Sequence, residues 1–162
     1  MIKLPLIPQW DALHPLIIHF PVALLLTVPL FILLGLLWKK HRQCFFVTSF
    51  IVLLLGAAAV FVAVSTGEAA GQLVERSAEI SPVLLRHSQL AHTTRILFTI
   101  LTVVYAGILF LPSALKKELK PFLKILMIVV FLIIYLVCSL ILADTAGHGG
   151  RLVHQYGVHA LL

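Results

Sequence analysis

Long apolar runs alternate with short polar connections along the whole chain. Four runs contain no Asp, Glu, Lys or Arg, namely residues 12–38, 43–67, 96–115 and 125–143. A helix needs about 20 residues to cross the roughly 30 Å hydrocarbon core of a bilayer, so each run is long enough or nearly so. The pattern predicts four transmembrane helices, with approximate spans at residues 15–38, 44–65, 93–112 and 122–143.

The remaining residues form short connections, and the fold predicted is an all-α up-down bundle in one membrane domain, residues 1–162. The longest connection is expected at residues 66–81, and a segment following the last helix at residues 144–162. Proline is tolerated in the first turn of a helix but removes a hydrogen bond further along. We therefore expect the first helix to begin near Pro15 and to kink near Pro29. No internal repeat is recognised.

Composition supports an integral membrane protein and excludes other classes. Hydrophobic residues make up 61% of the chain and charged residues only 11%, against about a quarter in soluble domains. The net charge of +6 comes from basic residues that flank the apolar runs, which argues against nucleic-acid binding. Cys44 and Cys138 fall on different helices, so no disulfide is expected. The absence of a Cys-x-x-Cys-His motif excludes covalently attached haem.

The distribution of charge predicts the orientation in the membrane. The connections after the first and third helices carry seven basic residues against one acid, Glu118, whereas the other side carries five basic and five acidic residues. Because basic loops stay in the cytoplasm, both termini are expected outside. The predicted location is the inner membrane of a bacterium, crossed several times, with the neutral side in the periplasm.

Seven of the eight histidines fall on this outer side. They are His14, His19, His87, His92, His148, His154 and His159. Imidazole is the commonest metal ligand in proteins and is poorly tolerated in lipid without a partner, so the cluster predicts a site. His41 lies in the basic cytoplasmic turn and His159 among the last four residues, and neither is expected to be a ligand.

Two helices each carry a pair of histidines five residues apart, His14 with His19 and His87 with His92. Five residues turn a helix by about 500°, so the rings of each pair point about 140° apart and address different neighbours. His92 is favoured over His87, which is expected nearer the solvent. Arg95, one turn beyond His92, is expected to face lipid headgroups, an anionic cofactor group or a carboxylate.

The ends of the second and fourth helices add polar and small residues to this cluster. His148, Arg151 and His154 follow the fourth span, and Asp144 stands four residues before His148 as an orienting carboxylate. Glycines around His148 favour a helix stop there. Glu68 is expected to pair with a histidine or arginine of the cluster. Gly67 and Gly71, four residues apart, predict close approach of a helix or planar ligand.

These motifs resemble a known family. Leu13 to Pro21, the segment from Thr66 to Gly71, and Gly147 to Val153 are similar to elements of a bacterial membrane family, number 2231 in the domain-of-unknown-function series. The resemblance covers essentially the whole chain. It implies a four-helix membrane domain, often found near or fused to cytochrome-type modules, which favours a redox role.

The function favoured is that of a b-type cytochrome, an electron-transfer subunit holding one or two non-covalent haems through histidine pairs. His19 with His92 is the first expected pair, and His14 with His148 or His154 the second. Arg95 or Arg151 would lie near the propionates. Quinol or a membrane oxidoreductase would donate electrons, and a periplasmic carrier such as cytochrome c would accept them. The alternatives are a copper or zinc site at the outer face and a non-catalytic anchor or assembly subunit of a respiratory complex.

Overall fold

The computed structural model describes residues 10–116 and 120–158, and the regular structure within them is entirely helical. The first crossing is made by α1 (His14–Ile17) and α2 (His19–Leu37), which are separated by a break at Ile18. Short 3₁₀ helices precede them, η1 (Trp10–Leu13), and follow them, η2 (Lys39–His41). The other crossings are α3 (Arg42–Gln72), α4 (Ile80–Ala114) and α5 (Pro121–His154). The predicted all-α fold is confirmed.

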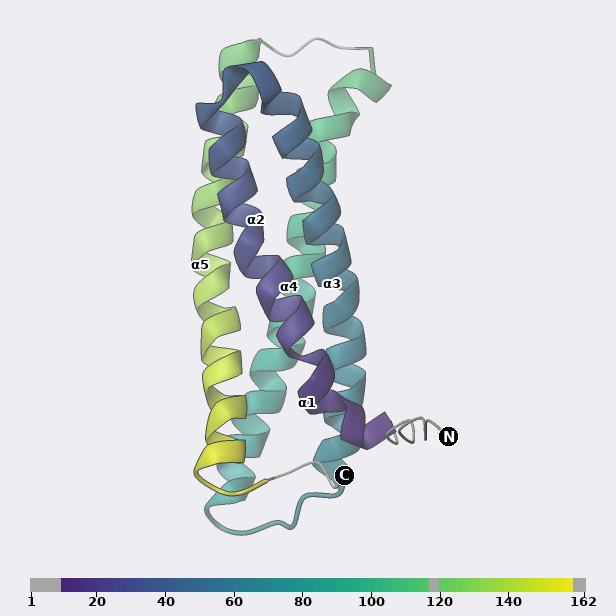
Figure 1. Ribbon diagram of the computed structural model, residues 1–162, viewed down its shortest axis with the longest axis vertical. Coiled ribbons are helices and arrows are strands. Elements are labelled where there is room, and N and C mark those ends of the chain that lie inside the picture. The colour runs from purple at the N-terminus through teal and green to yellow at the C-terminus, as the bar shows by residue number, and fades with distance from the viewer. Residues whose placement is uncertain (1–9, 117–119, 159–162) are drawn as a thin grey trace, which may run out of the picture.

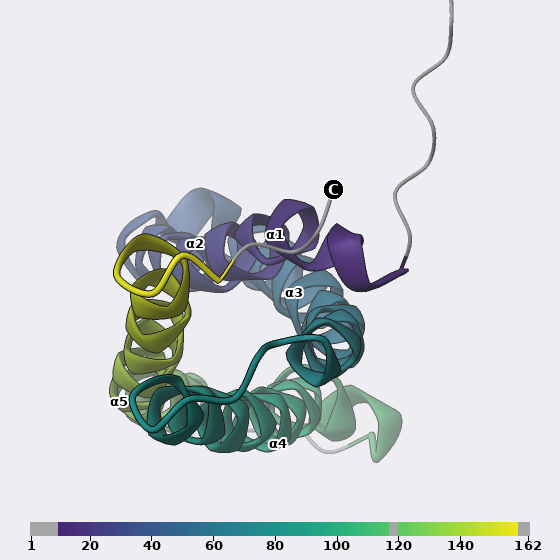
Figure 2. The same cartoon turned by 90° about the horizontal axis from the view of Figure 1, so that it is seen from below.

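The long helices run up and down along one axis (Figure 1). Seen along that axis they form a ring in the order α2, α3, α4 and α5, in which each helix packs against the next and α5 packs back against α2 (Figure 2). The start of α1, the α3–α4 connection and the end of α5 lie together, and we call this the histidine end. The opposite end, with Lys39, Arg42 and Lys120, we call the basic end.

All four crossings are long and apolar enough to span a membrane, as predicted. Large apolar side chains are exposed along the outside of every long helix, among them Leu26, Leu55, Val103 and Ile133. The interior is equally apolar, with Tyr105 and Phe131 stacked at 4.5 Å between ring centroids. An apolar exterior around an apolar core is what a bundle solvated by lipid requires.

The helices are longer than the apolar runs. α3 continues to Gln72 and α4 begins at Ile80, so the α3–α4 connection is residues 73–79 rather than 66–81. α5 does not stop at the glycines after Asp144 but continues to His154. Glycine lowers helix stability by only about 1 kcal/mol per residue, and packing at the histidine end, described below, offsets this. Polar residues therefore extend the helices beyond the predicted spans.

Pro29 lies inside α2, and the helix continues through it. Proline has no N–H, so the carbonyl of Leu25, four residues earlier, loses its helical donor. The buried hydroxyl of Tyr135 on α5 donates to that carbonyl at 2.8 Å. A hydroxyl from a neighbouring helix thus replaces the missing backbone donor, and it ties α5 to α2.

Tyr135→Phe is therefore expected to lower the free energy of unfolding by about 1–3 kcal/mol, because it leaves the buried Leu25 carbonyl without a donor. In a Pro29→Ala background the new backbone amide at position 29 can donate instead, and the same change should then lower stability by less than about 1 kcal/mol. Unfolding titrations in mixed detergent micelles measure this coupling. Tyr105→Phe, whose hydroxyl bonds Ser49, is the control and should show no coupling to position 29. Equal losses from Tyr135→Phe in both backgrounds would contradict the assignment.

Candidate functional site

The histidine end brings together His14 of α1 and His87 of α4. Their ring centroids are 6.4 Å apart and their planes meet at 73°. α4 does not neighbour α1 or α2 in the ring of helices but lies across the bundle from them (Figure 2). The two half-buried imidazoles therefore meet across the interior.

Each of the two rings is held through Nδ1. The Nδ1 of His14 lies 3.2 Å from the hydroxyl of Thr66, which already donates to backbone carbonyls of its own helix and so accepts from the imidazole. The Nδ1 of His87 donates to the carbonyl oxygen of Thr145 at 3.0 Å. In a neutral imidazole with a protonated Nδ1, Nε2 carries the lone pair. An Nδ1–H fixed by a backbone or side-chain oxygen is how proteins orient a histidine that binds a metal through Nε2.

Two glycines provide the surfaces on which these rings lie. A Cβ added at Gly67 of α3 would stand 2.8 Å from Cε1 of His14, and one added at Gly149 of α5 would stand 3.0 Å from Cε1 of His87. No larger residue fits at either position without displacing the ring. Gly71 was expected to share the close approach with Gly67, but a Cβ added there would make only ordinary contact with Leu84, at 3.8 Å.

Each half of the bundle places one of the two histidines against a threonine and a glycine of its own last helix, but through different atoms. In the first hairpin, formed by α1, α2 and α3, His14 bonds the hydroxyl of Thr66, 52 residues later. In the second hairpin, formed by α4 and α5, His87 bonds the backbone carbonyl of Thr145, 58 residues later. A second histidine follows each by five residues. The imidazole pair lies between the two hairpins.

The side chain of Thr145 also joins α4 to α5. Its hydroxyl donates to the Ile141 carbonyl at 2.7 Å and accepts from the buried hydroxyl of Thr94 at 2.9 Å. Sequence reasoning missed Thr94 and Thr145. Thr145 meets His87 through its backbone carbonyl, a contact that does not depend on the type of residue at position 145.

His92 belongs to a separate polar group on α3 and α4. Its Nδ1 accepts from the Arg95 guanidinium at 3.1 Å, so its protonated Nε2 donates to Oε1 of Glu68 at 3.2 Å. The partner expected for Glu68 is confirmed. Both ring nitrogens of His92 are engaged, and Arg95 also lies 5.7 Å from the ring centroid of Phe61.

His19 is exposed on the outside of α2, and its Nδ1 donates to the Pro15 carbonyl at 3.0 Å. His14 points inward, so a histidine five residues further along must point away from the interior. The structure consequently does not bring His19 to His92, the first pair expected from the sequence. It brings His14 to His87 instead of to His148 or His154.

His148 has the orienting carboxylate that its spacing predicted. Its Nδ1 lies 3.0 Å from the backbone carbonyl and 3.2 Å from Oδ1 of Asp144, whose Oδ2 lies 3.7 Å from Arg86. Arg151 donates to Gln155, and both Arg151 and His154 are exposed. His159 lies outside the described residues. Within residues 10–116 and 120–158, no three of His, Cys, Asp and Glu are grouped to hold one metal ion.

The fold and this arrangement define a four-helix membrane protein whose two hairpins hold an imidazole pair between them at one end. The chain belongs to the family described as "Predicted membrane protein (DUF2231)", which matches residues 10–161. The family expected from the motifs is thereby confirmed. No curated protein and no solved structure matches the chain.

Proposed function

We propose that the protein is a b-type cytochrome-like electron-transfer subunit that binds haem between His14 and His87. The 6.4 Å between their ring centroids carries the proposal. Two imidazoles that bind one metal through Nε2, each at about 2 Å and on opposite sides, have ring centres about 6 Å apart. This pair replaces the pairs expected from the sequence, and it supports one haem rather than two.

Residues around the imidazole pair support this proposal. His14 and His87 would hold the haem, which would supply the change of oxidation state that electron transfer needs. Thr66 and the Thr145 carbonyl would hold the two rings in the ligating tautomer. Arg151, exposed at the same end, is the candidate for a propionate partner.

A reduced-minus-oxidised visible spectrum with a pyridine haemochrome assay tests the proposal, on protein produced with ample haem. One b-type haem per chain is expected. A spectrum without a b-type band refutes it. Copper or zinc bound in stoichiometric amount would establish the alternative metal site instead, and elemental analysis of the same sample measures both.

The histidine end is proposed to face the periplasm of a bacterial inner membrane. Support comes from the basic end, where Lys39, Lys40, Arg42 and Lys120 cluster as in cytoplasmic connections. A haem at the opposite end would exchange electrons with a quinol or membrane oxidoreductase and with a periplasmic carrier such as cytochrome c.

Cysteine labelling should reveal this orientation. In a background lacking Cys44 and Cys138, a membrane-impermeant maleimide is expected to label Ala78→Cys in intact spheroplasts, because Ala78 is exposed in the α3–α4 connection. Lys40→Cys should react only after lysis. The reverse pattern would place the histidine end in the cytoplasm.

A further inference from the structure

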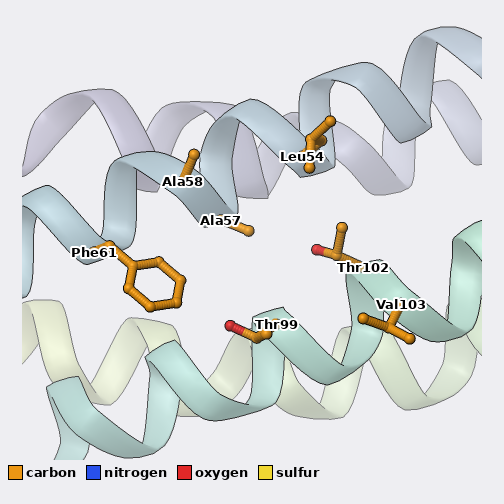
Figure 3. Close-up of a pocket in the computed structure, with 7 residues that line it drawn as sticks. All are labelled: Leu54, Ala57, Ala58, Phe61, Thr99, Thr102 and Val103. Atoms are coloured by element: carbon orange, nitrogen blue, oxygen red, sulfur yellow. The ribbon is translucent and has the colours of Figure 1, made fainter.

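A groove of about 440 Å³ opens between α3 and α4 on the outside of the bundle. Leu54, Ala57, Ala58 and Phe61 form its α3 wall, and Thr99, Thr102 and Val103 its α4 wall (Figure 3). Leu54, Ala58, Phe61 and Val103 are exposed, so the groove is accessible from the surrounding lipid.

The groove is apolar although two threonines line it. The Thr99 hydroxyl donates to the Arg95 carbonyl and the Thr102 hydroxyl to the Phe98 carbonyl, each at 2.7 Å. The single O–H donor of each threonine is therefore used within α4. Ala57 and Ala58 on the α3 wall are small, and they leave room for an apolar hydrocarbon chain.

Polar groups lie immediately beyond the end of the groove that points toward the histidine end. Arg95 lies over the Phe61 ring and, by helical rise, about 6 Å beyond Thr99. Its guanidinium bonds His92, which bonds the half-exposed carboxylate of Glu68. Glu68 and Arg95 balance in charge, so this polar group is neutral overall.

From this juxtaposition we infer that the groove binds a membrane quinone, with its apolar tail between α3 and α4 and its ring beside Glu68, His92 and Arg95. A hydroquinone hydroxyl finds a charged acceptor in Glu68, and a quinone carbonyl finds a donor in Arg95. Because the group formed by Glu68, His92 and Arg95 is neutral overall, it gives the phosphate of an anionic phospholipid no net attraction. Charge complementarity thus favours the uncharged head of a quinone over a phosphate.

Binding is tested on the full chain in phosphatidylcholine nanodiscs, with tritium-labelled decylubiquinone and its reduced form as probes. We expect one saturable site per chain above the linear partition into lipid. Ala58→Phe fills the groove and should weaken binding at least about tenfold, while Leu55→Phe, one turn away and outside the groove, leaves it unchanged. Val103→Phe blocks the opposite wall and replaces Ala58→Phe if that variant does not fold.

The head group has its own test. Glu68→Gln removes the charged acceptor and should weaken binding of the reduced probe more than binding of the oxidised probe. Glu75→Gln, in the α3–α4 connection, should change neither affinity. The absence of a saturable site, equal affinity in all groove variants, or competitive displacement by phosphatidylglycerol overturns the inference. The inference does not rest on haem. A chain that is produced with ample haem, contains none and still binds the probe at this site would refute the proposed cofactor and leave the quinone site standing.

Discussion

His14→Ala and His87→Ala are each expected to abolish the low-spin b-type spectrum of the purified protein. Each change removes one of the two imidazoles that meet 6.4 Å apart, and the iron would lose one axial ligand. The loss in haem affinity should reach or exceed the roughly 100-fold that changes to ligand-orienting residues produce. Haem titration of the apoprotein, followed by its visible spectrum, measures the effect.

His19→Ala and His92→Ala are the matched controls, since they remove the second histidine of each five-residue pair. His19 is exposed on the outer side of α2, and both nitrogens of His92 are engaged by Arg95 and Glu68. Both variants should keep the full low-spin spectrum. A spectrum lost in these two and retained in the His14 and His87 variants would restore the pairing read from the sequence.

Gly67→Ala should lower haem affinity by about 10–100-fold, because the new Cβ would stand 2.8 Å from Cε1 of His14 and push the ring off Thr66. The added methyl should also destabilise the haem-free chain by about 1–3 kcal/mol. Haem titration and detergent unfolding measure the two effects separately, so the steric prediction can be checked even in a chain without cofactor.

Gly71→Ala, one turn away on the same helix, is the control, because its Cβ would make only a 3.8 Å contact. It should leave haem affinity unchanged and slightly favour the helix. On α5 the neighbours Gly149 and Gly150 form a second matched pair, since a Cβ at Gly150 meets no atom within 4 Å. Gly67→Ala behaving like Gly71→Ala would show that the glycine does not set the position of His14.

Some contacts at the histidine end could be predicted from the sequence. They either join residues close together on one helix or satisfy a charged group that needs a partner. Asp144 and His148 are four residues apart on one helix, which places them side by side in any helical fold. Glu68 at an apolar boundary needed a cationic or hydrogen-bonding partner, and His92 is that partner. The partner of Arg95 was less constrained, since several acceptors lay at the same depth, and it is His92 rather than a carboxylate.

Other features depended on contacts between distant segments. The Tyr135 hydroxyl supplies a donor to Leu25, 110 residues away, so that Pro29 is accommodated within α2. α5 was expected to stop at its glycines, but it continues to His154. One of these glycines, Gly149, packs closely against the ring of His87. Neither contact can be recognised from neighbouring residues in the sequence.

By itself, the sequence determined that this is a four-helix membrane protein with most of its histidines gathered at one end, since uninterrupted apolar length and the order of the crossings suffice for that. Only the tertiary structure decided that His14 meets His87 while His19 points outward and His92 pairs with Glu68. The choice depends on how each helix is rotated about its axis. In a soluble bundle an apolar stripe reveals that rotation, but here the lipid-facing and core-facing sides are equally apolar, so packing alone selects the face.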